Sequence, residues 1–397
     1  MVSSGFTRTT LGRAIALAAL AVLTAALAAC QSPGTKAQAT GTPAVTAPAA
    51  AQAQAGVTRN SIGLGLYEVQ VLDANTLAVA AAPAFGDATR GQLHIVDSRT
   101  LAVLQSIELP RRAFGLGVNR STQTLYVGNT LDGSLTVIDL ATRTVQGTIQ
   151  LGIKDASGDM EHTRKVVVDA KTNRIFVTSP GDKGKVWIVD GKTRKVRHTL
   201  SNLGNWTAGA AYDGASHRLY VGQGGTHEIL AIDADKGKIV KRFTTGDTVG
   251  SEKSKHFLLN VALHPATHRL FATDSNTNSL YVFDTRTGAV IKQIPLGKGA
   301  LDVLFNPIRQ EIYTTNRGVG HGDKSGTGQL TVIDAQTYAV TRTIDLPPHP
   351  NSLALSQDAQ ALFVTVKEPH GKEHPSYKEG ELDSIVRIDL DAAQSRL

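Results

Sequence analysis

Seven aspartates recur along the chain, each at the end of a short apolar segment. A ring of carboxylates of this kind could hold a metal ion or exchange protons with a substrate. However, an aspartate that opens a turn accepts a hydrogen bond from the backbone two residues later, and a threonine three residues on fits the same turn. We therefore interpret these aspartates as turn residues. They are Asp97, Asp139, Asp190, Asp233, Asp284, Asp334 and Asp389, and the threonines are Thr100, Thr142, Thr193, Thr287 and Thr337.

The histidines suggest metal chemistry, because His370 and His374 stand four residues apart and flank Glu373. Imidazoles with a carboxylate are typical ligands of a divalent transition metal. This spacing brings two side chains together only on a helix, and Gly371 and Pro375 predict a loop here. No HExxH, GxSxG or Walker motif is present. We expect no metal site and no bound cofactor. The other histidines expected on the same face are His162, His256, His321 and His349.

Basic residues interspersed with aromatic residues are typical of a surface that binds single-stranded nucleic acid. The formal charge is +7, of which Arg8 and Arg13 belong to the N-terminal leader, so +5 remains on the rest of the chain. This is a mild excess, and acidic residues in the same loops dilute it, so ordinary solvated loops remain the alternative. The basic candidates are Arg111, Arg112, Lys255, Arg317 and Lys367.

The candidate residues stand on or between short β-strands that are arranged in repeats. Residues 124–150 contain three consecutive strands with alternating apolar residues, and no segment is long enough for a typical helix. Four short strands per repeat predict an all-β, seven-bladed β-propeller over residues 58–397, with about 49 residues per blade. Copies of the repeat lie at 92–103, 185–196, 228–239, 279–290 and 329–340, with a truncated copy at 384–390.

The truncated copy indicates how the ring closes. It stops just after Asp389, so the last blade lacks its outer strand, and a segment near 56–62 is positioned to supply it. Pairing of the N- and C-terminal strands would then close the ring and remove free sheet edges.

Long loops are confined to one face of the predicted propeller. The connections between the first and second strands, and between the third and fourth, are short and lie on one face. All insertions fall on the other face, which indicates that a ligand binds there. The insertions are residues 83–91, 153–164, 244–255, 316–328 and 367–383.

Aligning the inner strands places a mixed set of side chains at the channel mouth on the loop-rich face. Charges, an indole and an imidazole at one funnel could bind a small or extended polar ligand. Alternatively, paired charges and bridging waters plug the channel. The predicted ligand-binding residues are Tyr67, Glu68, Phe114, Arg164, Lys165, Trp206, His256, Asp302 and Asn351.

The N-terminal segment predicts export. Residues 14–29 are apolar and follow two arginines, and Leu27-Ala28-Ala29-Cys30 resembles the lipobox of bacterial lipoproteins. We expect a lipoprotein signal peptide at 1–29, lipidation of Cys30 and a disordered Ala/Thr/Pro-rich tether at 30–57. Gln31, directly after the cysteine, resembles the sorting signal of outer-membrane lipoproteins. We therefore expect the chain to lie in the periplasm and to contact the outer membrane through its lipid alone. An ordinary signal peptide with a chance cysteine remains the alternative.

The repeats resemble the YVTN-repeat β-propellers, specifically the YncE-like branch of exported bacterial proteins. The segments that carry the resemblance lie at 65–69, 122–130, 255–263, 301–317 and 349–367. The resemblance implies a periplasmic seven-bladed propeller without established catalysis, and single-stranded DNA binding is reported for a relative. Trp206 and the Arg111-Arg112 pair depart from the family pattern. Tyr67, Glu68, Phe114, Arg164, His256 and Asn351 fall on positions that look shared.

These features together predict a monomeric, non-enzymatic binding propeller anchored in the cell envelope. Its partner would be an envelope protein or polymer, with single-stranded DNA as a candidate. The alternative is a metal- or cofactor-dependent propeller enzyme that uses the same funnel, similar to lactonases or haem-binding reductases.

Overall fold

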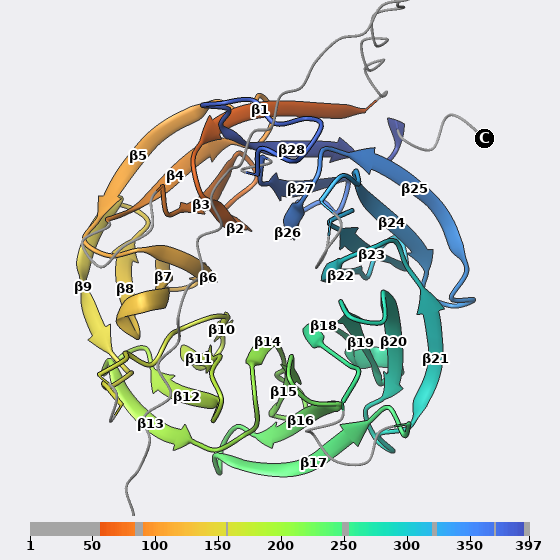
Figure 1. Cartoon of the computed structure of the whole chain (residues 1–397). Coiled ribbons are helices and arrows are strands. Elements are labelled where there is room, and N and C mark those ends of the chain that lie inside the picture. Colours follow the sequence, from red (N-terminus) through yellow and green to blue (C-terminus); the bar gives the residue numbers. More distant parts are fainter. Residues whose placement is uncertain are drawn as a thin grey trace, which may run out of the picture. The chain divides into compact units, whose positions relative to one another are not determined.

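The computed structural model describes residues 56–83, 90–155, 158–247, 254–319, 324–368 and 371–392. These residues form seven four-stranded sheets around a central axis (Figure 1). The first strand of each blade lies at the axis and the last lies at the rim. The predicted all-β, seven-bladed propeller is therefore confirmed. Among the described residues, no helix is long and apolar enough to cross a membrane.

The blades follow one another in chain order. Blade 1 contains β2 (Leu66–Val71), β3 (Thr76–Ala81), β4 (Gly91–Asp97) and β5 (Val103–Leu109). Blade 2 contains β6 (Ala113–Asn119), β7 (Thr124–Asn129), β8 (Ser134–Asp139) and β9 (Thr144–Gln150), with the short 3-10 helix η1 (Thr130–Asp132). Blade 3 contains β10 (Val166–Asp169), β11 (Arg174–Ser179), β12 (Lys185–Asp190) and β13 (Lys195–Leu200). Blade 4 contains β14 (Thr207–Asp213), β15 (Arg218–Gln223), β16 (Glu228–Asp233) and β17 (Lys238–Thr244).

Blades 5 to 7 complete the ring. Blade 5 contains β18 (Leu258–His264), β19 (Arg269–Asp274), β20 (Ser279–Asp284) and β21 (Val290–Pro295), with η3 (Pro265–Thr267). Blade 6 contains β22 (Ala300–Asn306), β23 (Glu311–Asn316), β24 (Gly328–Asp334) and β25 (Val340–Leu346). Blade 7 contains β26 (Pro350–Leu355), β27 (Ala361–Val366), β28 (Asp383–Asp389) and, from the other end of the chain, β1 (Val57–Gly63).

The seventh blade closes the ring as predicted. β1 pairs antiparallel with β28, with Val57 opposite Ile388, and the Asp389 N–H donates a 2.7 Å hydrogen bond to the Gly56 carbonyl. The outer edge of β28 is thus covered by the other end of the chain. β1 begins at Val57, within the segment expected to be a tether. The expected signal peptide (1–29) and residues 30–55 of the tether lie outside the described residues.

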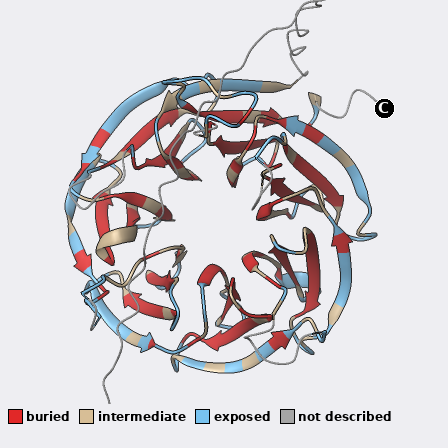
Figure 2. Cartoon of the chain, viewed as in Figure 1, coloured by how far each residue is buried: buried red, intermediate tan, exposed pale blue. Residues whose placement is uncertain are grey.

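The core lies between neighbouring blades. Figure 2 shows the inner and middle strands buried and the rim strands largely exposed. In one cluster Tyr126 and Val137 of blade 2 pack against Trp187 of blade 3, and none of the three is more than 2% exposed. Burial of a large apolar side chain stabilises the fold by about 1.5–3 kcal/mol. A blade gains this stabilisation only against the next blade, which explains why the repeats fold as a closed ring.

A β-bulge shapes the inner strand of six blades. In blade 1, Leu66 pairs with Ala81 and Val69 pairs with Val79, so two residues of β2 stand opposite one residue of β3. A bulge bends a strand and redirects its side chains. Each bulge lies at the end of the inner strand next to the loop-rich face, and the two extra residues supply the channel mouth described below.

A threonine in the second strand ties several bulges to the next blade. In blade 7, Thr365 Oγ1 accepts a 3.1 Å hydrogen bond from the Ser352 N–H and donates a 2.6 Å bond to the Tyr67 carbonyl in blade 1. The bulge takes both backbone groups out of the regular strand ladder, and the threonine hydroxyl supplies a partner to each. Thr178, Thr273 and Thr315 make the corresponding bonds in blades 3, 5 and 6.

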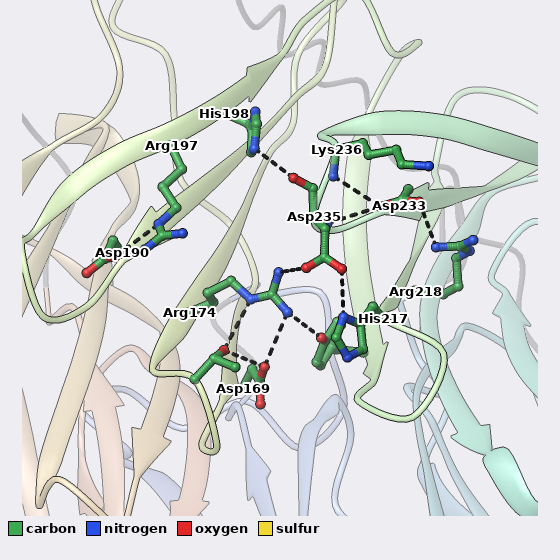
Figure 3. A network of polar contacts seen from close by, with 12 residues as sticks. Asp169, Arg174, Asp190, Arg197, His198, His217, Arg218, Asp233, Asp235 and Lys236 are labelled. Carbon is green, nitrogen blue, oxygen red and sulfur yellow. Dashed lines mark hydrogen bonds and ion pairs between the residues drawn. The ribbon is translucent and has the colours of Figure 1, made fainter.

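The recurring aspartates are turn residues, as the sequence predicts. Thr100 N–H and Oγ1 donate to Asp97 Oδ1 at 2.7 and 2.8 Å, and the other six aspartates accept equivalent backbone bonds. Figure 3 shows Asp233 bonded to the Lys236 backbone and paired with Arg218 at 3.0 Å. These hydrogen bonds hold the pKa of Asp97 below its usual range, so its carboxylate serves the turn in its charged form.

Candidate ligand-binding site at the channel mouth

The channel mouth consists of two rings of residues supplied by the bulges. The outer ring lies nearer the loop-rich face and changes from aromatic and cationic residues in blades 1 to 3 to aliphatic residues in blades 4 to 6. Its members are Tyr67, Phe114, Arg164, Ala208, Leu259, Leu301 and Asn351. The inner ring is Glu68, Gly115, Lys165, Gly209, Asn260, Asp302 and Ser352.

The inner ring holds three charged residues, of which Glu68 and Lys165 form an ion pair while the charge of Asp302 acts on Lys165. Lys165 Nζ lies 2.9 Å from Glu68 Oε1, and Glu68 Oε2 accepts a 2.9 Å bond from the Leu116 N–H. Asp302 accepts bonds of 2.8 and 3.0 Å from two backbone N–H groups, those of Leu353 and Val303. These groups form the central plug, so the alternative of paired charges fits the inner ring.

The electrostatics of the central plug follow from burial. Burial opposes the charge of Lys165, but the nearby carboxylates of Glu68 and Asp302 outweigh it and raise the pKa of Lys165. Burial raises the pKa of Asp302, although Lys165 and two backbone N–H groups act against the shift. The plug therefore holds Lys165 charged and is stabilised mainly by its internal partners.

The outer ring carries a stack of two cations and two aromatic rings. The centroids of Tyr67 and Phe114 lie 4.2 Å apart. Arg164 Cζ lies 4.7 Å from the Phe114 centroid, and Lys367 Nζ lies 3.8 Å from the Tyr67 centroid. Cations over ring faces are stabilised by the quadrupole of the ring. Lys367, Tyr67, Phe114 and Arg164 are called the cation–aromatic stack below.

Lys367 is a strongly perturbed member of this stack. Burial is the main cause that lowers the pKa of Lys367 to about 8; the Asp383 carboxylate, 3.8 Å away, opposes this shift and the charge of Arg112 adds to it. Burial also lowers the pKa of Arg164, against the charges of Glu68 and Asp302. Both cations are thus held in an environment that disfavours unbalanced positive charge.

Arg317 adds a further cation to the mouth. The Arg317 N–H donates a 3.0 Å hydrogen bond to the Gly299 carbonyl, and the Arg317 carbonyl accepts a 2.9 Å hydrogen bond from the His349 N–H. These bonds place Arg317 between the starts of β22 and β26. Burial lowers the pKa of Arg317, and the charge of Arg164 lowers it further. The Nε atoms of Arg164 and Arg317 are both buried, and neither has a hydrogen-bond partner among the described residues.

Trp206 lies on the same face but outside the rings. It is 43% exposed, and its ring centroid lies 5.7 Å from that of Phe257. Its φ of 56° is unusual for a bulky residue. Two backbone hydrogen bonds hold this conformation: the Trp206 N–H donates to the Gly181 carbonyl at 2.9 Å, and the Trp206 carbonyl accepts from the Gly224 N–H at 2.7 Å. The fold therefore maintains backbone strain to present an indole to solvent.

His256 and Asn351 serve the structure of the mouth. His256 is 1% exposed, and its Nδ1 and Nε2 lie 2.6 and 2.7 Å from carboxylate oxygens of Asp274 and Asp247. Lys255 pairs with Asp247 at 2.7 Å. Asn351 Nδ2 donates a 3.3 Å hydrogen bond to the Tyr67 carbonyl. The structure thus gives each of these predicted ligand-binding or nucleic-acid residues a partner within the protein.

Arg111 and Arg112 differ in their surroundings. Arg111 is exposed and pairs with Asp132. Arg112 is 3% exposed, and its carbonyl accepts a hydrogen bond from the Thr130 N–H. Of this pair, only Arg111 presents its side chain to solvent.

The described residues contain no group of three or more His, Cys, Asp and Glu side chains suited to hold a metal ion. His374 Nε2 contacts the Gly326 carbonyl at 3.2 Å, and His374 Nδ1 accepts a 3.0 Å hydrogen bond from the Ser376 N–H. His321 and His370 lie outside the described residues.

Two clefts on the opposite, short-turn face were not anticipated from the sequence. One has a volume of about 620 Å³, lies between blades 4 and 5 and is lined by Arg218, Tyr220, Lys241 and Arg286 among others. The other, of about 670 Å³, lies between blades 7 and 1. Their walls come from adjacent blades, so no single repeat contains the pattern. The cations of the first cleft already have protein partners, since Arg218 and Arg286 pair with Asp233 and Asp284.

Comparison with curated proteins finds relatives along most of the chain. The YncE protein of Salmonella typhimurium is 35% identical over 335 residues, which cover 84% of this chain and 90% of the relative. The YncE protein of Escherichia coli is 33% identical over 342 residues, 85% of this chain and 92% of the relative. Both are described as uncharacterized. Antigen Lp49 of Leptospira interrogans is 27% identical over 146 residues, 35% of this chain and 30% of the antigen.

No family model matches the chain. The YncE relatives nevertheless span nearly the whole propeller, and the repeat motifs that suggested them occupy the β-strands of the seven blades. The resemblance stated from the sequence is confirmed: the chain belongs to the YncE-like family of β-propeller proteins.

Proposed function

We propose that this protein is a non-enzymatic binding propeller of the cell envelope, and that single-stranded DNA binds at the channel mouth on its loop-rich face. The observation that carries the proposal is the cation–aromatic stack together with Arg317. Cations attract the phosphates of a strand, and aromatic rings pack against its bases, without reading a sequence. The mouth brings both kinds of group together at the centre of one face.

Trp206 supports the proposal as a platform for a base. Its indole is exposed, whereas the ring faces of Tyr67 and Phe114 are already in contact with each other and with cations. An exposed indole held rigidly costs little entropy when a base stacks on it, and stacking of a base on an aromatic ring contributes about 1–3 kcal/mol. The strand would therefore pass over Trp206 and place phosphates near Arg164 and Arg317.

The envelope location rests on the N-terminal segment. A lipid on Cys30 would anchor the chain, and residues 31–55 would link the anchor to the propeller. Incorporation of labelled palmitate into the full chain, and its loss in Cys30→Ser, is the expected result. Export without incorporation would indicate an ordinary signal peptide.

Binding is tested with a fluorescent oligothymidylate and the purified propeller at several salt concentrations. Trp206→Ala should weaken binding about tenfold or more, since it removes one stacking contact. Binding should also weaken steeply as salt rises, because each neutralised phosphate releases counterions. The matched control is Ile308→Ala, which removes a residue that is 67% exposed on the opposite face.

If both Trp206→Ala and Arg164→Gln bound the oligonucleotide with unchanged affinity, the ligand would not bind at the channel mouth and the proposal would be wrong. Metal analysis of the purified chain separates the proposal from the enzyme alternative. A stoichiometric bound ion would favour the metal-dependent class.

A further inference from the structure

Arg164 and Arg317 form an unusual pair at the mouth. They come from blades 3 and 6, and each carries a buried Nε–H group that bonds no atom of the described residues. Burying a donor without a partner costs about 1–3 kcal/mol. Among the described carboxylates, none forms an ion pair with either guanidinium. Two half-buried guanidinium groups with unused donors at one opening indicate a place for an anion.

The charge balance of the mouth points the same way. Among the described residues of the mouth, five cationic side chains stand beside three carboxylates, which leaves a surplus of two positive charges in a half-buried region. The cations are Arg112, Arg164, Lys165, Arg317 and Lys367, and the carboxylates are Glu68, Asp302 and Asp383. A group carrying two negative charges would balance this surplus.

The central plug limits how such a group can enter. Glu68 and Lys165 form an ion pair just inside the outer ring, and the charge of Asp302 acts on Lys165, so a strand drawn along the axis would bring its phosphates against two carboxylates. A ligand at the axis must therefore arrive end-on and stop above the plug. The end of a chain meets this condition, whereas an internal phosphodiester continues in both directions.

We propose that Arg164 and Arg317 bind a phosphate monoester at the end of a nucleic-acid strand, and that the strand then leaves the mouth over Trp206. This inference rests on the binding function proposed above and adds which part of the ligand the axis recognises. A phosphate monoester carries close to two negative charges at neutral pH and has three acceptor oxygens, so it suits two guanidinium forks. A phosphodiester offers one charge and two free oxygens.

The test compares oligothymidylates of equal length that carry a 5′-phosphate, a 3′-phosphate or hydroxyls at both ends. One phosphorylated form should bind about tenfold or more tightly than the hydroxyl form, as expected for added charge-assisted hydrogen bonds. Arg317→Gln should abolish this preference, so that in this variant the phosphorylated and the hydroxyl-ended strands bind with equal affinity. Arg317→Lys, which keeps the charge but lacks the fork, should retain only part of it. Arg111→Gln is the matched control, because Arg111 is exposed and paired with Asp132.

Two further arms identify the source of the phosphate. Inorganic phosphate and thymidine monophosphate should compete with the phosphorylated strand and not with the hydroxyl-ended one. Equal affinity for all three strands would overturn the inference and leave the proposed function standing. Binding of thymidine monophosphate that depends on Arg317, without binding of any strand, would refute the DNA ligand and retain the anion site. Thermal unfolding of each variant establishes that it is folded.

Discussion

Lys165 of blade 3 and Glu68 of blade 1 meet at 2.9 Å across the propeller axis, although 97 residues separate them in the chain. Asp302 of blade 6 adds a second carboxylate, whose charge acts on Lys165. Charges from three blades thus lie together at the inner ring, beneath the outer ring of the mouth.

The plug should be important for stability. Glu68→Gln leaves the Lys165 ammonium without its closest counterion, and removal of one partner of a buried pair costs about 3–5 kcal/mol. Since Lys165 is 22% exposed, we expect a loss near the lower end, measured by urea unfolding. The matched control is Glu373→Gln, whose partner Lys324 is 61% exposed; it should leave the unfolding curve unchanged. Wild-type stability in Glu68→Gln would mean that Lys165 has another counterion.

The threonine that ties blade 7 to blade 1 gives a second prediction. Thr365→Val preserves shape but leaves the Tyr67 carbonyl and the Ser352 N–H without this partner. We expect a loss of about 2 kcal/mol in the free energy of unfolding. Thr343→Val on the exposed face of β25 is the control and should change stability by less than about 0.5 kcal/mol. Equal behaviour of the two variants would contradict the role of this contact in ring closure.

Lys367 should make stability depend on pH. Burial lowers its folded-state pKa to about 8, from the ordinary lysine value of 10.5. Between these two values the unfolded chain binds more protons than the folded one, so this residue makes stability rise with pH. Relative to Lys367→Met, the wild type should gain up to about 3 kcal/mol between pH 8 and pH 10.5. Urea unfolding at several pH values measures this difference, and a flat or falling difference would rule out the perturbed lysine.

The left-handed backbone at Trp206 predicts an inverted order of substitutions. Glycine adopts positive φ without cost, so Trp206→Gly should be more stable than Trp206→Ala by about 1 kcal/mol. At Ile153, which is 67% exposed and does not have positive φ, Ile153→Gly should be less stable than Ile153→Ala. Urea unfolding of the four variants decides the matter. The same order at both sites would show that Trp206 is not strained.

The strands and turns could be predicted from the sequence because their causes are local. The alternation of apolar residues in 124–150 follows the two-residue period of a strand, and Asp97 bonds a threonine three residues away. The truncated copy near Asp389 predicted closure by the N-terminal segment, because an unpaired edge requires a partner. Membership in a repeat family followed from the same regularity.

The sequence predicts the candidate residues at one end of the propeller, whereas their partners depend on how the blades close into a ring. Glu68 pairs with Lys165, and His256 faces Asp247 and Asp274, because ring closure and the bulges bring particular side chains together. Residues that meet across an axis have no fixed spacing in the chain. The strands, the turns and the number of blades could thus be read from the sequence, since these depend on neighbours along the chain. The tertiary structure decided which charges are neutralised in the plug and which guanidinium groups remain available at the mouth.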